Sequence, residues 1–165
     1  MRVLDCFAGY GRVWSRVAGI SGRKISRLPI DVKPGVGFHL PGDNREFLRQ
    51  LDLTRFNCVD LDAYSVPAEQ LEILHTRQYR GWVYATFCCM PLGGIPFKVF
   101  LRCGLPLAML RAAPTMFTRC GWDWIEDYLG RLGVTRIFRR QSKPGGFRRG
   151  QMHETYAAFV MDGGQ

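Results

Sequence analysis

Acidic side chains end three short apolar segments in the first part of the chain. Asp5 closes the first segment, Asp31 the second, and Asp60 and Asp62 the third. Because the carboxyl ends of parallel strands meet at one edge of a sheet, these carboxylates are expected to lie in one crevice. Carboxylates there can accept hydrogen bonds from an ammonium group and from both hydroxyls of a ribose. Together with the polar groups of residues 42–45, which suit an adenine edge, the segment ends at Asp5 and Asp31 predict a site for a nucleoside that carries a small zwitterion.

The first segment runs into a turn with two glycines, Gly9 and Gly11. Glycine lets the backbone turn tightly and approach a ligand closely. The free N–H groups of the helix that follows suit a carboxylate or a phosphate. A dinucleotide-binding turn requires a small residue three positions after Gly11, but Trp14 stands there. We therefore expect a ligand smaller than a dinucleotide; the alternative is a plain strand-to-helix turn.

The apolar periodicity predicts alternating strands and helices along the chain. Strands are expected at residues 2–7, 24–32, 57–61, 82–89, 134–140 and 155–161. Helices are expected from residue 13 to Gly19 or Gly22, after Asp43, after Pro67, in part of residues 96–110, and at residues 117–132. This order is typical of an α/β fold with a mostly parallel sheet, helices on both faces and a C-terminal antiparallel hairpin strand. No linker or repeat divides the chain, so residues 1–165 are predicted to form a single domain.

Residues 5–11, with the sequence DCFAGYG, resemble the first motif of the class I, Rossmann-like S-adenosylmethionine-dependent methyltransferases, D-x-F-x-G-x-G. Asp31 and residues 42–44 match the family's second and third cofactor motifs in order and spacing. The resemblance covers residues 2–90 and implies a minimal Rossmann-like methyltransferase sandwich with S-adenosylmethionine as the cofactor. The cofactor-binding residues that it implies are Asp5, Phe7, Ala8, Gly9, Gly11, Asp31, Val32, Asp43, Asn44 and Asp60. Taken alone, Asp43 is more often a helix cap.

Residues 60–67, with the sequence DLDAYSVP, resemble the D-P-P-Y type motif of amino-methylating enzymes. They are still more similar to the D-L-D-P-Y-G-S-P segment of tRNA guanine-N2 dimethyltransferases, although Ala63 stands where that segment has a proline. The resemblance implies a catalytic Asp62, which accepts a hydrogen bond from the target NH2 group, and a catalytic Tyr64, which stacks on the base. The plainer alternative is that Asp60 and Asp62 cap the following turn.

The chain carries a formal net charge of +9, which favours polyanionic partners. Basic residues concentrate between positions 136 and 149, interleaved with Phe138 and Phe147, in and beside the predicted hairpin loop. Arginine binds phosphate bidentately, so RNA or DNA is the predicted partner. The residues assigned to substrate binding are Arg139, Arg140, Lys143, Arg148 and Arg149. A solvated hairpin tip or a general solubility bias would explain the same charge.

The cysteines and histidines do not form a metal-binding pattern. No C-x-x-C pair occurs among the six cysteines, and the three histidines are scattered. Cysteines among apolar neighbours fit reduced thiols in a cytoplasmic protein. No secretory signal is visible, and the apolar stretches are too short to span a bilayer. Methylation at pyrimidine C5 needs a cysteine nucleophile, usually after a proline of the fourth motif, and no cysteine stands there.

The residues and the resemblance together favour an enzyme, a methyltransferase that N-methylates an exocyclic amine of a nucleobase in RNA, such as tRNA, or in DNA. A second hypothesis is a methyltransferase for a small molecule or a protein, whose basic surface is incidental. A third is a non-catalytic protein that binds S-adenosylmethionine and nucleic acid, with a regulatory role. Because a minimal domain lacks recognition elements, a homodimer or an accessory subunit is a further expectation.

Overall fold

The computed structural model describes residues 1–33, 39–63, 65–88, 97–113, 116–141 and 154–163. They form a seven-stranded sheet with the strand order β3-β2-β1-β4-β5-β7-β6. The strands are β1 (Arg2–Asp5), β2 (Ser26–Asp31), β3 (Leu40–Pro41), β4 (Cys58–Leu61), β5 (Arg80–Cys88), β6 (Val134–Gln141) and β7 (Glu154–Asp162). The first five strands pair in parallel, whereas β7 runs antiparallel between β5 and β6. The predicted α/β fold with a C-terminal antiparallel hairpin strand is confirmed.

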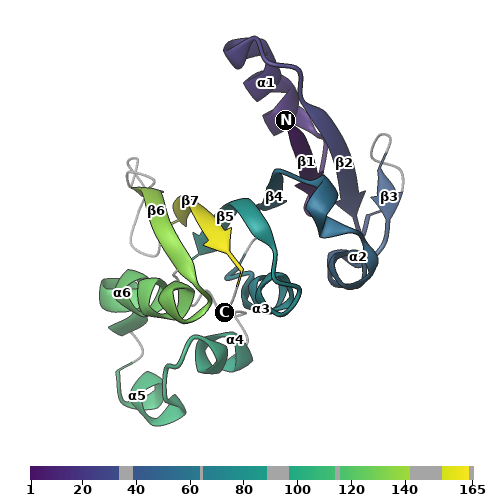
Figure 1. The fold of residues 1–165 in the computed structure, drawn as a ribbon. Helices are drawn as coiled ribbons and strands as arrows, with labels where there is room; N and C mark the ends of the chain where they lie inside the picture. The colour runs from purple at the N-terminus through teal and green to yellow at the C-terminus, as the bar shows by residue number, and fades with distance from the viewer. Residues whose placement is uncertain (34–38, 64, 89–96, 114–115, 142–153, 164–165) are drawn as a thin grey trace.

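Helices cover the two faces of this sheet unequally (Figure 1). Of the helices that the structure describes, only α1 (Arg12–Ser21) lies on one face. The opposite face carries α2 (Asn44–Gln50), α3 (Ala68–Thr76), α4 (Phe97–Arg102), α5 (Leu107–Ala112) and α6 (Met116–Arg131). A short 3-10 helix, η1 (Leu53–Arg55), precedes β4. Helices on both faces were expected; the asymmetry was not.

Aspartate, glycine and proline residues set several of the element boundaries. Asp43 caps α2, because its carboxylate accepts a hydrogen bond from the backbone N–H of Arg45. Gly104, at a φ of +86°, and Pro106 separate α4 from α5, so the expected helical stretch at 96–110 is two short helices. The strands match their predicted ranges within two residues, except that the two-residue β3 was not predicted.

The larger apolar core lies between the sheet and helices α2 to α6. Leu4, Val59, Val83 and Phe159 project into it from the adjacent strands β1, β4, β5 and β7, and all four are fully buried. They pack with side chains of the helices, such as Ile125 of α6. Since alternate residues of a strand point to opposite faces, the other face of each strand must be covered separately.

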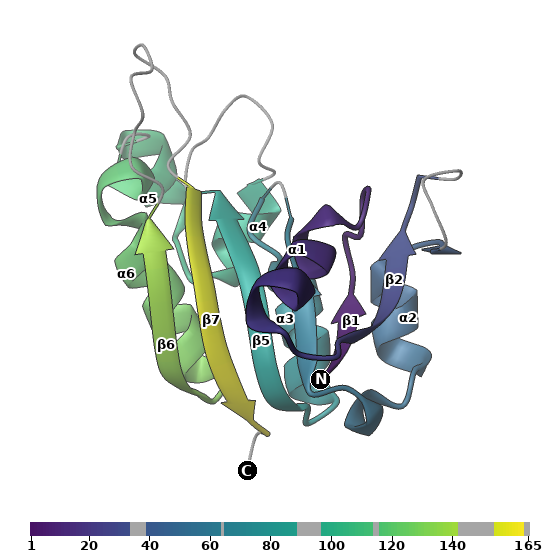
Figure 2. The same cartoon turned by 90° about the horizontal axis from the view of Figure 1, so that it is seen from above.

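On its own face, α1 covers β1 and β4. Its buried Trp14 forms a small core with Val3 of β1 and Cys58 of β4. On the same side of β5, β7 and β6, no described helix lies over the strands (Figure 2). Exposed aromatic side chains occupy these three strands: Trp82, Tyr84, Phe138 and Tyr156. The cover expected on both faces is therefore present for only part of the sheet.

None of the helices in the described ranges is long and apolar enough to cross a membrane. The same ranges contain no group of three or more histidine, cysteine or acidic residues placed to hold a metal ion. Three cysteines of the described part, Cys6, Cys58 and Cys103, are buried free thiols.

Candidate functional site

The strand order reverses at β1, because the chain adds β2 and β3 on one side of it and β4 on the other. Parallel α/β sheets bind ligands at the carboxyl edge beside such a reversal. Asp5 ends β1 there, next to its register partner Asp60 of β4. The backbone N–H of Cys6 donates to the carbonyl of Asp60 at 3.0 Å, which extends this pairing beyond Asp5. Asp31 ends β2 at the same edge.

The glycine turn follows β1 and is hydrogen-bonded to the end of β2. Gly9 and Gly11 have φ angles of +46° and +67°, in the left-handed region that favours glycine. The backbone N–H of Gly9 donates to Asp31 Oδ2 at 2.8 Å. Phe7 is half-buried and Ala8 is buried between the glycines and β1. The hydrogen bond to Asp31 therefore holds the predicted turn in place. The other carboxylate oxygen of Asp31 accepts a hydrogen bond from a second backbone N–H.

That second donor is the backbone N–H of Lys33, 2.9 Å from Asp31 Oδ1. Burial by itself would raise the pKa of Asp31, but the N–H groups of Lys33 and Gly9 lower it below its ordinary value. Val32, beside this carboxylate, is 65% exposed. A carboxylate has about four acceptor positions, so an ionised Asp31 keeps capacity for further donors after these two bonds.

Asp5 and Asp60 are nearly buried carboxylates, 4% and 8% exposed. Burial raises the pKa of Asp5 to about 6, and the guanidinium of Arg27, whose Nη1 lies 3.4 Å from Asp5 Oδ2, opposes this rise. Burial also raises the pKa of Asp60 to about 7, against a hydrogen bond from Trp14 Nε1 at 2.6 Å. Two adjacent carboxyl groups with raised pKa values at a strand-order reversal are typical of a functional site.

Asp43 and Asn44 have structural partners in α2 and its surroundings. The guanidinium of Arg45 donates to both carboxylate oxygens of Asp43, which also caps the helix. Asn44 is buried; its Nδ2 donates to the carbonyl of Cys6 at 2.8 Å, and its Oδ1 accepts from Gln70 Nε2 at 3.0 Å. The helix cap that was the plainer interpretation of Asp43 is confirmed, while the roles of Asp43 and Asn44 toward a ligand stay predictions.

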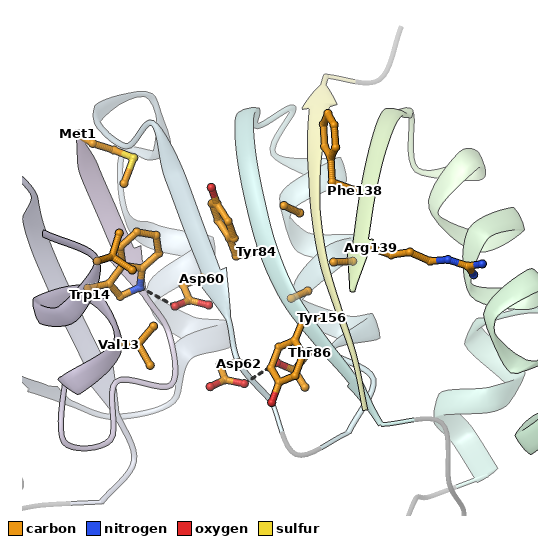
Figure 3. Close-up of a pocket in the computed structure, with 14 residues that line it drawn as sticks. Met1, Val13, Trp14, Asp60, Asp62, Tyr84, Thr86, Phe138, Arg139 and Tyr156 are labelled. Atoms are coloured by element: carbon orange, nitrogen blue, oxygen red, sulfur yellow. Dashed lines mark hydrogen bonds between the residues drawn. The ribbon is translucent and has the colours of Figure 1, made fainter. Parts of the chain in front are cut away.

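Asp62 follows β4 and is exposed at the wall of a cavity of about 530 Å³ (Figure 3). Thr86 of β5 donates from its Oγ1 to Asp62 Oδ1 at 2.5 Å. Asp60, Trp14 and Tyr84 line the same cavity. The structure thus brings the two aspartates of the fourth motif to one cavity, with Asp60 buried and Asp62 open to solvent.

Of the remaining predicted residues, the structure describes Arg139 and the backbone of Arg140. Arg139 points toward α6, and its guanidinium lies 5.3 Å from the ring centre of Trp122, although atoms of the residue also border the cavity (Figure 3). Arg140 belongs to β6. Tyr64, Lys143, Arg148 and Arg149 lie outside the described residues, so their predicted roles are not tested.

The sequence did not predict three contacts that shape the site. They are the bond of Trp14 to Asp60, the ion pair of Arg27 with Asp5, and the bond of Thr86 to Asp62. Arg27 and Thr86 lie inside strands, where no local pattern marks them. Only the register between neighbouring strands brings them to the carboxylates.

No family model and no curated protein sequence matches this chain. Solved structures match its fold. An rRNA methylase candidate from Clostridium thermocellum aligns over 99% of this chain and 88% of its own, with a TM-score of 0.56 and 9% identity. The Dnmt2 methyltransferase of S. pombe aligns over 100% of this chain and 50% of its own, with a TM-score of 0.54 and 10% identity. An S-adenosylmethionine-dependent methyltransferase from Aquifex aeolicus covers 98% and 82%, with a TM-score of 0.50 and 14% identity. The chain therefore has the Rossmann-like methyltransferase fold.

Proposed function

We propose that this protein is an S-adenosylmethionine-dependent methyltransferase that N-methylates an exocyclic amine of a nucleobase in RNA or DNA. One observation carries the proposal. The buried Asp5 and Asp60 and the fixed Asp31 share the edge at which the strand order reverses, in a fold common to methyltransferases. The fourth-motif resemblance and the charge of +9 support the choice of acceptor.

The carboxylates of the site fit a cofactor that joins a ribose to a cationic amino-acid group. Asp31 retains acceptor capacity for ribose hydroxyls, because its two oxygens each accept one backbone N–H. Burial raises the pKa of Asp5 and of Asp60, so a bound ammonium or sulfonium would stabilise their charged forms. When bound, S-adenosylmethionine supplies an electrophilic methyl group. Gly9 leaves room for close approach of the backbone to this ligand, whereas the space that a Cβ of Gly11 would take is occupied by the guanidinium of Arg27.

Asp62 is the residue proposed to hold the acceptor amine. Thr86 donates to its Oδ1, which fixes the orientation of the carboxylate and leaves Oδ2 to accept from an NH2 group. That bond would turn the nitrogen lone pair toward the methyl donor and would stabilise the positive charge that develops on nitrogen. Orientation of this kind lowers a barrier by roughly 7–11 kcal/mol in the best-positioned systems. Tyr64 is proposed to stack on the same base.

The first test measures S-adenosylmethionine binding by calorimetry, with Asp31→Ala as the cofactor-site variant. Labelled cofactor is then incubated with tRNA and with DNA, using intact protein, Asp62→Ala and Asp127→Ala. Asp127 is an exposed aspartate of α6 and serves as the matched control. We expect Asp62→Ala to abolish transfer and to change cofactor affinity by no more than a few-fold, and Asp127→Ala to do neither.

Each other outcome points to a different function. No cofactor binding by the intact protein would remove the proposal. Binding without transfer to either pool would favour the non-catalytic nucleic-acid-binding protein. Transfer only to small molecules or proteins would leave a methyltransferase with a different acceptor. Full transfer by Asp62→Ala would refute the role given to this aspartate.

A further inference from the structure

One side of β5, β7 and β6, which we call the open face, carries four exposed aromatic side chains. Their exposed fractions are 39% for Trp82, 40% for Tyr84, 46% for Tyr156 and 61% for Phe138. The strand register aligns Tyr84 and Phe138 across β7, with Ala158 between them. The small side chain in the central strand leaves a shallow floor between rings on either side. Large exposed apolar surfaces of this kind mark binding sites.

We propose that the open face binds single-stranded nucleic acid. Bases stack on exposed aromatic rings of protein sheets, and this contact tolerates any sequence because every base has a π face. Trp82 and Phe138 lie with their ring centres 6.0 Å apart and their planes tilted by 37°, so β5 and β6 present a joint aromatic surface across β7. Tyr84 makes a T-shaped contact with the buried Trp14, with 5.6 Å between the ring centres and 87° between the ring planes. Because this contact already restricts the Tyr84 side chain in the free protein, Tyr84 loses less conformational entropy when it binds a base.

Charge favours a polyanion over a second copy of this chain. Arg136 is exposed on β6, and the register pairs it with Val160 of β7, in the row of Trp82. Arg12 and Arg16 are exposed on α1, each next to a valine whose side chain lines the cavity. Two copies facing each other would oppose these arginines and the net charge of +9 on each chain. Phosphates would instead pair with them.

The strands of the open face can be stable without a helix packed over them. Its strands pair in antiparallel fashion, β5 with β7 and β7 with β6. Antiparallel sheets commonly leave one face to solvent, whereas parallel sheets are covered on both. What needs explanation is the kind of side chain on this face, since a solvated face is normally polar. Stacking partners explain aromatic rings next to arginine better than an aliphatic helix does.

The open face is continuous with the candidate acceptor site. Tyr156 is the register partner of Thr86, which donates to Asp62 (Figure 3). A strand stacked on Phe138 and Tyr156 would therefore deliver its next base toward Asp62. Only this last step rests on the proposed methyltransferase function, because strand binding needs neither the cofactor nor catalysis.

The experiment measures fluorescence anisotropy of labelled 12-nucleotide dT and U strands, and of a duplex, without cofactor. Phe138→Ala and Trp82→Ala remove rings of the open face, and Arg136→Gln removes a charge. Leu101→Ala and Arg111→Gln are matched controls, because both residues are exposed on helices of the opposite face. Thermal denaturation of each variant checks folding; Phe138 is the more exposed ring, so its variant remains informative if Trp82→Ala unfolds.

We expect Phe138→Ala to weaken single-strand binding about tenfold, with the controls unchanged. Arg136→Gln should also lower the slope of log affinity against log salt by about 0.7, the contribution of one phosphate. Tighter binding of the dT or of the U strand decides between DNA and RNA. The proposal is overturned if folded Phe138→Ala binds as tightly as intact protein, or if duplex binds best. It is also overturned if the intact protein is a dimer that Phe138→Ala dissociates. Methyl transfer is scored separately, so strand binding without transfer leaves this inference standing.

Discussion

We expect Asp60→Asn to gain stability over the intact protein as the pH rises. The difference in unfolding free energy between the variant and the intact protein should be larger at pH 8 than at pH 4. Burial raises the pKa of Asp60 from 3.8 to about 7, so the folded state keeps a proton that the unfolded chain releases. The contribution of Asp60 to the stability of the intact protein therefore falls as the pH rises from about 4 to about 7, and then stays reduced. Asparagine is neutral at every pH, so this decline disappears.

The size of the effect follows from the pKa change. From 3.8 to about 7 is roughly three pKa units, and each unit is worth about 1.4 kcal/mol, so ionised Asp60 costs the fold on the order of 4 kcal/mol. Coupling to Asp5 shares part of this cost, so we expect the free energy of unfolding of Asp60→Asn to gain about 2–4 kcal/mol over the intact protein between pH 4 and pH 8.

Urea unfolding followed by tryptophan fluorescence at pH 4, 5, 6, 7 and 8 measures this gain. The asparagine Oδ1 can still accept from Trp14 Nε1, and any packing penalty is the same at each pH. Hence the pH slope is the informative quantity, and the absolute stability is not. Asp127→Asn, at an exposed position, controls for the loss of one negative charge. Parallel pH curves for intact protein and Asp60→Asn would mean that this carboxyl ionises normally, and the argument from burial would be refuted.

Two further substitutions test the surroundings of the carboxylates. Gly11→Ala places a Cβ 2.3 Å from Arg27 Nη1 at a φ of +67°, so we expect a loss of about 1–2 kcal/mol in unfolding free energy, measured by denaturant titration. The pKa of Asp5 should rise further as Arg27 moves away. An unchanged stability would show that the turn is relaxed. Asp43→Ala removes the cap of α2 and the pairing with Arg45, for an expected loss of about 0.5–2 kcal/mol by the same titration, while Asp43→Asn keeps a capping oxygen and should recover about half or more of it.

Much of the fold could be predicted from the sequence because its boundaries are local. Apolar segments that end in aspartate or glycine fix β1, β2 and β4 within two residues. Gly104 and Pro106 mark an interruption in the stretch at 96–110, but helical spacing on both sides of them leaves the bounds of α4 and α5 open. β3 escaped prediction because two residues carry no periodicity; it is a strand only through its pairing with Ile30 and Asp31.

The placement of the candidate-site carboxylates was predictable where strand topology alone determines it. Parallel strands bring Asp5, Asp31 and Asp60 to one edge whatever their exact register. The bond of Thr86 to Asp62 depends instead on the register of β4 with β5, which pairs Leu61 with Ala85. The rotation of α1 about its axis likewise decides that Trp14 reaches Asp60, and helical spacing leaves that rotation open.

Trp14 contacts both the buried Asp60 and Tyr84 of the open face. Its size argued against a dinucleotide turn, and the structure gives it three roles that a small residue could not fill. It closes the small core with Val3, it donates to Asp60, and its ring supports the edge of Tyr84. The donated bond stabilises the ionised form of Asp60, whereas burial favours the protonated form. One side chain thus contacts both a buried carboxyl group and a ring of the open face, so we expect a ligand at either place to affect the same side chain.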